Sequence, residues 1–196
     1  YMPMVPEAAA ALYGCFSVGA IAVPVFSGFG TDAVATRLAD AETPVLFTAD
    51  GFYRRGEPVR LKPTADEAID RVGHVERVVI YDRLGSRAAE DEPVPWHDDR
   101  DAWWGDAVGT RSTDFEPASL PSGQESMLLY SSGTTGEPKG IVHTHAGALV
   151  QAAKEIYFGF DHRPDDRFFW VSDVGWMMGP WTLVGNHAFG GTIVMY

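Results

Sequence analysis

The chain has 196 residues, of which 45% are hydrophobic and 21% charged, so we expect one domain or one and a half around a substantial core. Its formal net charge of −12 disfavours nucleic-acid or anionic-membrane binding, although a few amides and one Lys can still hold a phosphate. Nothing is apolar over the roughly 18 residues that a membrane span needs, and the single cysteine, Cys15, excludes an intrachain disulfide, so a cytoplasmic location is expected.

Helices and strands are expected to alternate along residues 1–83. Helical periodicity predicts helices over residues 6–19, 32–42 and 64–72. Short apolar runs predict strands over residues 21–26, 44–48 and 77–81. Thr31 is expected to cap the second helix. Near-continuous apolar strands between helices favour an α/β fold of layered, mainly parallel sheets flanked by helices.

Residues 84–124 differ in character from the rest of the chain. They are rich in acids, Pro, Gly and Ser, and we expect an irregular surface connection with one short helix near residues 98–107. Beyond them, residues 125–196 return to an alternating pattern. That portion is expected to hold strands over 127–130, 167–171 and 192–196 and helices over 144–158 and 177–189.

Residues 131–140 read Ser-Ser-Gly-Thr-Thr-Gly-Glu-Pro-Lys-Gly and follow a predicted strand. Three glycines let backbone amides approach an anion closely, and four hydroxyl side chains add hydrogen-bond donors. Lys139 supplies a mobile positive charge. The spacing is not that of a Walker A loop, because Gly140 rather than Ser or Thr follows the Lys. Composition alone leaves open a plain Gly/Ser surface turn.

The string from Tyr130 to Gly140 closely resembles the signature loop of the adenylate-forming superfamily, which includes acyl-CoA synthetases, luciferases and peptide-synthetase adenylation domains. Further segments resemble the acetyl-CoA synthetase branch, and they follow in the expected order at residues 1–8, 25–29, 48–50, 101–104 and 173–176. The resemblance implies that residues 1–196 are part of the large N-terminal adenylation domain. Residues 1–83, 84–124 and 125–196 would be its first α/β portion, irregular connection and phosphate-loop portion.

The acyl-CoA synthetases of this superfamily activate a carboxylic acid with ATP as an acyl-adenylate and transfer the acyl group to CoA. The resemblance therefore implies ATP, Mg²⁺ and CoA as substrates or cofactors and a small carboxylic acid as the substrate. Phosphate binding is assigned to the signature loop, with contacts from Ser131, Ser132, Gly133, Thr134, Thr135, Gly136 and Lys139. No metal-binding side chain and no catalytic residue is assigned within the chain.

Three residues that follow the motif at 173–175 are implied to line the acyl pocket: Trp176, Met177 and Met178. The acetyl-CoA synthetase pattern typically has Val and Thr at the last two positions, and both are Met here. Methionine is adaptable and apolar, which favours an acid other than acetate, short-chain or branched. The alternative is that both Met side chains belong to an ordinary helix core.

Arg54 falls where acetyl-CoA synthetases place an Arg that reaches the CoA nucleotide. The second basic residue of that pattern is Glu57 here, which leaves a solvated loop Arg as the alternative. His143 and His145 flank the start of a predicted helix, and we expect them to cap or pack rather than to transfer protons.

The superfamily's Tyr-Gly-x-Thr-Glu motif, ribose-binding Asp and adenylation Lys do not occur in the 196 residues, so the chain alone is expected to be an inactive internal fragment. Two alternatives stay open for its function. One is an adenylating enzyme that loads a carrier protein, and the other is a non-catalytic nucleotide- or acyl-binding module.

Overall fold

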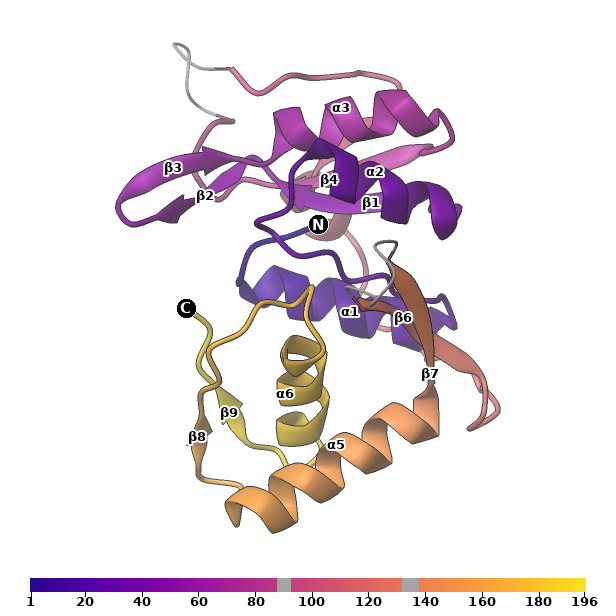
Figure 1. Ribbon diagram of the computed structural model, residues 1–196, viewed down its shortest axis with the longest axis vertical. Helices are drawn as coiled ribbons and strands as arrows, with labels where there is room; N and C mark the ends of the chain where they lie inside the picture. The colour runs from indigo at the N-terminus through magenta and orange to yellow at the C-terminus, as the bar shows by residue number, and fades with distance from the viewer. Residues whose placement is uncertain (88–92, 132–137) are drawn as a thin grey trace. The chain divides into compact units, whose positions relative to one another are not determined.

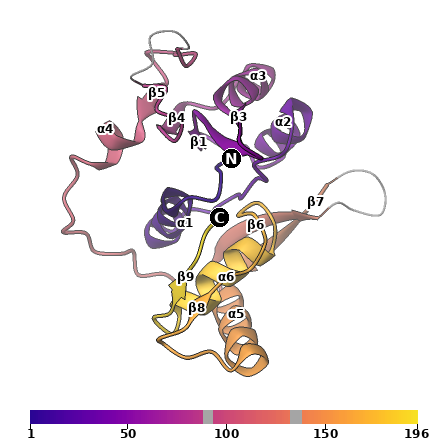
Figure 2. The same cartoon turned by 90° about the vertical axis from the view of Figure 1, so that its left-hand side faces the viewer.

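The computed structural model describes residues 1–87, 93–131 and 138–196. These residues form two compact units. The first unit comprises residues 1–3 and 25–115, and the second comprises residues 4–24 and 116–196. Helix α1 therefore belongs with the C-terminal half of the chain rather than with the strands that follow it directly. Figures 1 and 2 together label the elements, which are described below unit by unit.

A parallel three-stranded sheet forms the centre of the first unit. Its strands lie in the order β1 (Val45–Ala49), β4 (Arg77–Tyr81) and β5 (Asp101–Trp103). Three helices accompany it: α2 (Thr31–Asp40), α3 (Lys62–Val72) and α4 (Trp104–Val108). The remaining strands, β2 (Gly51–Arg54) and β3 (Glu57–Arg60), pair as an antiparallel hairpin. The parallel α/β organisation that the apolar strands predict is confirmed.

Alternation along the strands explains where the core of the first unit lies. Thr48 pairs with Ile80 across β1 and β4, and both are fully buried, as is Val78 two residues before Ile80. Residues two apart face the same side of a sheet, so these side chains share one face. Helices α2 and α3 lie side by side in Figures 1 and 2. They bury Val34, Leu38, Ala65, Ala68 and Ile69.

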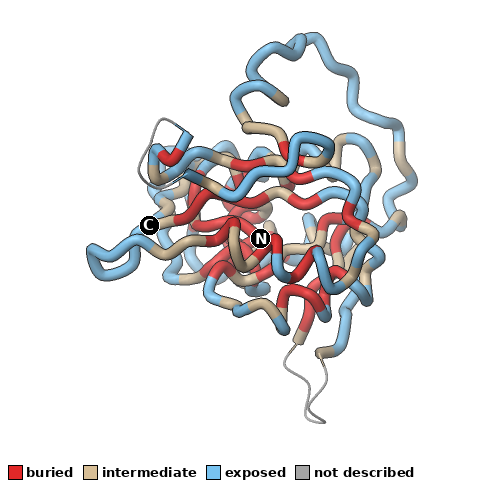
Figure 3. The backbone as a smooth tube through the Cα atoms, turned by 90° about the horizontal axis from the view of Figure 1, so that it is seen from above, coloured by how far each residue is buried: buried red, intermediate tan, exposed pale blue. Residues whose placement is uncertain are grey.

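The second unit combines a hairpin with three longer helices. The hairpin strands β6 (Glu125–Ser131) and β7 (Lys139–Thr144) are antiparallel, whereas the short strands β8 (Arg167–Phe168) and β9 (Thr192–Ile193) are parallel. The helices are α1 (Pro6–Val18), α5 (His145–Phe160) and α6 (Met178–His187). Figure 3 shows the buried segments in the interior and the exposed ones along the outer loops.

Helices α5 and α6 pack unusually closely at one glycine. A methyl group at Gly185 would lie 2.7 Å from the backbone oxygen of Ala152 and 2.7 Å from a side-chain carbon of Ile156. Neither distance is tolerated between real atoms, so the two helix backbones can approach this far only because Gly185 has no side chain. Ile156 and Leu183, on the two helices, are almost fully buried around this contact.

Several predicted elements differ from the observed ones. The strand expected over 21–26 is reduced to a bridge at Ala22, whose N–H donates to Ser126 and whose carbonyl accepts from Leu128. Pro24 has no N–H with which to extend that ladder. Thr31 is the first residue of α2 rather than its cap, and its hydroxyl donates to Glu67 at 2.8 Å.

The remaining differences concern short strands. The strands expected over 167–171 and 192–196 are only two residues long, as β8 and β9. The strands β2, β3, β5 and β7 were not expected. Each of these four has six residues or fewer, and a run so short carries little periodicity.

Within the described residues, no helix has the length and apolar character that crossing a membrane requires.

Candidate functional site: the hairpin loop and the cavity beside it

The predicted phosphate-binding segment begins and ends on the β6–β7 hairpin. Ser131 is the last residue of β6 and pairs with Lys139, the first residue of β7. The Ser131 hydroxyl also donates to the Lys139 carbonyl at 3.5 Å, and the Lys139 side chain is exposed. Five predicted phosphate-binding residues lie outside the described residues: Ser132, Gly133, Thr134, Thr135 and Gly136. The structure thus brings together the two residues that bracket the segment.

The segment is followed by a strand rather than by a helix. Helix α5 begins at His145, only after the six residues of β7. Its N terminus is capped internally, because the Thr144 hydroxyl accepts a hydrogen bond from the Gly147 N–H at 3.2 Å. This arrangement differs from a P-loop, where a helix N terminus follows the glycines directly and holds the phosphate. A phosphate at this hairpin would depend on the segment itself and on Lys139.

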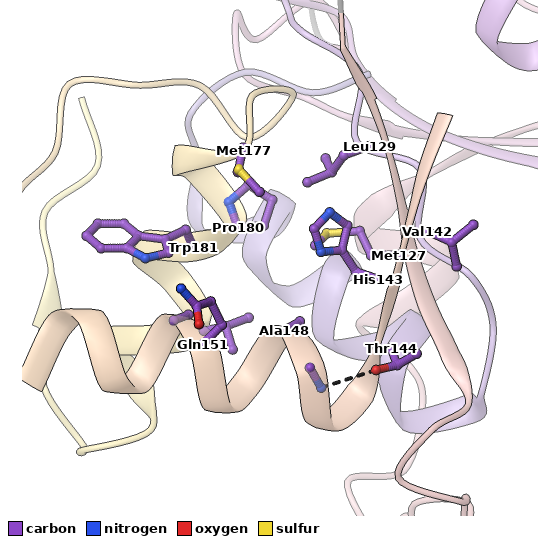
Figure 4. A pocket seen from close by; sticks show the side chains of 13 residues that line it. Met127, Leu129, Val142, His143, Thr144, Ala148, Gln151, Met177, Pro180 and Trp181 are labelled. Atoms are coloured by element: carbon purple, nitrogen blue, oxygen red, sulfur yellow. Dashed lines mark hydrogen bonds between the residues drawn. The ribbon is translucent and has the colours of Figure 1, made fainter. Parts of the chain in front are cut away.

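A cavity of about 330 Å³ lies beside the hairpin within the second unit. Its walls come from β6 and β7, from α5, and from α6 with the residue before it (Figure 4). Most of the lining side chains are apolar; the full lining is Met127, Leu129, Val142, His143, Thr144, Gly147, Ala148, Gln151, Ala152, Met177, Pro180, Trp181 and Val184. Apolar cavities of this size with few polar groups are typical of small-molecule sites.

Of the three predicted acyl-pocket residues, only Met177 lines this cavity. Trp176 is 40% exposed, and its backbone N–H donates to the Asp173 carbonyl at 3.0 Å. Met178 is half-buried as the first residue of α6, and its carbonyl accepts from the Thr182 hydroxyl at 2.7 Å. The structure therefore separates Met177 from its two sequence neighbours.

Two cavity-lining side chains are held by the same carboxylate. Glu155 on α5 accepts a hydrogen bond from the Trp181 indole N–H at 2.7 Å and another from the Gln151 amide at 2.5 Å. Gln151 and Trp181 both face the cavity in Figure 4. Charge-assisted hydrogen bonds of this kind fix the orientation of the groups that they join.

Sequence reasoning missed the part that Trp181 plays in this cavity. Met177 and Trp181 are four residues apart and so share one side of α6, while Ala148, Gln151 and Ala152 have the matching spacing on α5. That signal was present in the sequence. The spacing alone could not predict a cavity, because part of the lining comes from β7, a strand that was not expected.

The two histidines before α5 have different surroundings. Burial lowers the pKa of His143 below its ordinary value of 6.5. Its Nε2 atom is buried and has no hydrogen-bond partner within the described residues. The ring of His145 packs edge-on against Phe16, with centroids 5.8 Å apart. Neither histidine has a described carboxylate or hydroxyl partner that would form a proton relay.

Arg54 lies in the first unit, at the end of the β2–β3 hairpin, where it pairs with Glu57. Arg55 and Gly56 form the turn with φ angles of 54° and 86°. Two consecutive positive φ angles define the tight turn that suits the twist of a hairpin, and glycine accepts one of them without strain. Arg54 is exposed, and within the described part of the chain its side chain makes no hydrogen bond or ion pair. It is therefore accessible to an anion.

No group of three or more His, Cys, Asp or Glu side chains among the described residues is placed to hold a metal ion.

Comparison with known proteins places the chain in one family. The family model described as AMP-binding enzyme matches residues 1–196. An acetyl-coenzyme A synthetase of Streptomyces coelicolor is 45% identical over 198 residues, which cover 100% of this chain and 30% of that protein. One from Citrobacter koseri is 40% identical over 199 residues, with the same coverage.

A solved structure shares the fold. The acetoacetyl-CoA synthetase from Streptomyces lividans matches with a TM-score of 0.87 and 31% identity, over 100% of this chain and 29% of that chain. The chain spans about 30% of the length of the curated relatives. The match of the family model along the whole chain, with the likeness in sequence and fold, leads to one conclusion: the chain belongs to the AMP-binding enzyme family.

Proposed function

We propose that the protein containing this chain is an ATP-dependent acid–CoA ligase that forms AMP. The observation that carries the proposal is the similarity of the entire chain to acetyl-coenzyme A synthetases at 39–45% identity. The signature string at residues 131–140 also supports it, because Ser131 and Lys139 pair on the β6–β7 hairpin and Lys139 is exposed.

The proposed reaction has two steps. A carboxylate oxygen of the acid bonds to the α-phosphorus of ATP, the bond to pyrophosphate breaks, and an acyl-adenylate forms. The CoA thiolate sulfur then bonds to the acyl carbon, and AMP leaves with the electron pair of the broken C–O bond. Because the first step joins two anions, its catalysis requires neutralised charge and alignment.

The segment from Ser131 to Lys139 is proposed to neutralise that charge. Hydroxyl groups and amides of Ser131, Ser132, Gly133, Thr134, Thr135 and Gly136 would donate to the β- and γ-phosphates, and the Lys139 ammonium would add a full positive charge. Mg²⁺ commonly binds through substrate phosphates and one or two carboxylates. Mg²⁺ would accompany ATP and screen the charge of the phosphates.

The other substrates are assigned to separate parts of the chain. The exposed Arg54 would pair with a phosphate of the CoA nucleotide, and Trp176, Met177 and Met178 would lie near the acyl group. A cytoplasmic location, where Cys15 would stay reduced, is part of the same proposal.

The test is a substrate assay on the complete gene product. Purified protein is incubated with ATP, Mg²⁺ and a panel of carboxylic acids, and both isotope exchange between pyrophosphate and ATP and AMP release with and without CoA are measured. We expect acid-dependent exchange without CoA and sustained AMP release only with CoA. Exchange without any response to CoA would favour the loading of a carrier protein. The absence of exchange with every acid would leave only nucleotide binding and would overturn the proposal.

A further inference from the structure

Residues from several separate elements form the apolar interior of the cavity in the second unit. Met127 and Leu129 project from β6, Ala148 and Ala152 from α5, and Trp181 from α6 (Figure 4). Strands β6 and β7, which form one wall, are the strands whose far ends bracket residues 132–137. The β6–β7 hairpin therefore both lines the cavity and carries the two ends of the predicted phosphate-binding segment.

The volume of the cavity exceeds what acetate needs. At the ~30 Å³ that one molecule occupies in liquid water, 330 Å³ corresponds to roughly ten water-sized groups. The two carbons of an acetyl group would leave most of that space empty, and an empty apolar space forfeits packing contacts. By the same measure, a chain of about four to eight carbons would occupy several times as much of the space as an acetyl group does.

Trp181 forms a rigid end to this space. Its indole N–H is held by Glu155 at 2.7 Å. Its ring also contacts three other aromatic rings, those of Phe160, Phe168 and Trp170, at centroid distances of 5.9, 6.1 and 5.5 Å. A ring that is fixed both by a hydrogen bond and by aromatic neighbours cannot rotate aside at low cost, so it sets a limit to what the cavity holds.

We propose that this cavity receives the apolar part of the acyl group, with Trp181 as the residue that limits acid length and Glu155 as the residue that positions Trp181. The inference rests on the proposed acid–CoA ligase activity and specifies its substrate class as apolar acids longer than acetate. Met177, which lines the cavity from the segment that precedes α6, connects it with the proposed acyl site.

The experiment measures exchange between pyrophosphate and ATP for the complete gene product with straight-chain acids from acetate to decanoate. Two variants change the cavity in opposite directions: Trp181→Ala enlarges it, and Ala148→Leu fills it from α5. Two more, Glu155→Ala and Glu155→Gln, remove or keep the acceptor that holds the Trp181 indole. Ala153→Leu is the matched control, because Ala153 lies on the same helix and does not line the cavity.

We expect the wild-type protein to favour acids of about four to eight carbons over acetate, since each methylene buried in such a pocket contributes about 10-fold or more. Ala148→Leu should lower the rate with the longest accepted acid at least 10-fold relative to the rate with acetate. Trp181→Ala should extend the accepted length by two or more carbons. Glu155→Ala should broaden the profile, and Glu155→Gln, which keeps an acceptor oxygen, should restore it.

Two results would overturn the inference while leaving the ligase function intact. The first is a wild-type optimum at acetate. The second is an Ala148→Leu variant that exchanges with the same length profile as the wild type and the Ala153→Leu control. The Ala148→Leu comparison decides the matter even if Trp181→Ala fails to fold. Failure of every acid to support exchange would instead reject the proposed function itself.

Discussion

Lys62 is a fully buried charged side chain of the first unit, and its surroundings explain how a charge is kept there. Its ammonium lies 2.7 Å from Asp66 and 2.7 Å from Asp101 and donates to the Pro95 carbonyl at 3.1 Å. Arg100 contacts both carboxylates as well. Two cations and two anions therefore form a closed network that joins α3 to β5 and to the segment before it.

Removing Lys62 should destabilise the protein strongly. Lys62→Met leaves two carboxylates buried with only Arg100 to balance them, and breaking a buried pair costs about 3–5 kcal/mol. Arg71→Met, also on α3, removes an ion pair with Asp32 in which both side chains are more than half exposed, and it should cost less than about 1 kcal/mol. Urea unfolding measures both variants. Equal losses of unfolding free energy in the two variants would mean that the buried network contributes no more than the exposed ion pair.

The same network makes stability depend on pH at the acid end. Burial is the largest influence on the pKa of Asp101 and would raise it, but the hydrogen bonds and positive charges of Arg100 and Lys62 outweigh burial and lower it below 3.8. A lowered folded-state pKa gives a stabilisation that is present above the unfolded value, near pH 3.8, and is lost as pH falls through the folded value.

We therefore expect the free energy of unfolding to fall with acidification below about pH 4, and the Asp101→Asn variant to lose part of that dependence. Denaturant titrations of both proteins between pH 2.5 and pH 7, with the acidic range sampled finely, provide the measurement. An unchanged slope in Asp101→Asn would show that other carboxylates account for the acid sensitivity.

Substitutions of Lys139 test the proposal that this side chain binds the phosphates of ATP. If its ammonium contacts the triphosphate, Lys139→Ala should lower the rate of AMP formation by about 10- to 100-fold, because a hydrogen bond to a charged group contributes about 1.5–3 kcal/mol. Lys139→Arg keeps the charge and should retain more activity than Lys139→Ala. Initial rates at varied ATP concentration separate binding from turnover. Full activity in Lys139→Ala would remove this residue from the assignment.

At the scale of elements, the contact between α5 and α6 determines the shape of the cavity. Gly185 allows the two backbones to approach, and the cavity-lining residues of both helices lie on the same side as that contact. A larger residue at position 185 would force the helices apart, because the nearest obstacle is the rigid backbone of Ala152.

Gly185→Ala should therefore destabilise the protein by about 1–3 kcal/mol. Gly14→Ala is the matched control: Gly14 lies in the middle of α1, and a methyl group there meets nothing within 4 Å. That change should stabilise by about 0.5–1 kcal/mol, because Ala favours a helix more than Gly does. Thermal unfolding distinguishes the two signs. A neutral Gly185→Ala variant would contradict the close packing.

For the molecule as a whole, the 196 residues contain the proposed triphosphate-binding segment but not all of the residues that the reaction needs. The Tyr-Gly-x-Thr-Glu motif and the adenylation Lys that the superfamily uses are absent from this sequence. We expect a purified polypeptide of residues 1–196 to form no acyl-CoA from ATP, acids and CoA, whereas the complete gene product forms it. Acyl-CoA detected with the polypeptide alone, by mass spectrometry, would contradict this expectation.

Elements with a strong local signal could be predicted from the sequence. Helix α1 is predicted to within a residue, from apolar periodicity and from Gly19, which ends it with a φ of 75°. Strand β4 is predicted at its observed bounds, because the run Val78-Val79-Ile80-Tyr81 that follows Arg77 is apolar throughout and has no competing pattern. The family assignment also came from local signal, since a contiguous string of ten residues at 131–140 needs no tertiary information to be recognised.

Contacts between distant residues could not be predicted in this way and are known from the fold. Strand β5 is three residues long and forms because β4 offers it a parallel edge, and β7 forms because β6 does the same in the antiparallel sense. Trp181 lines the cavity and donates to Glu155 on another helix, and Met177 lines the cavity without Trp176 and Met178. Such contacts join residues far apart in sequence, and no local propensity encodes them. The sequence therefore determined the family and the main helices, while packing between distant segments decided the cavity and its lining.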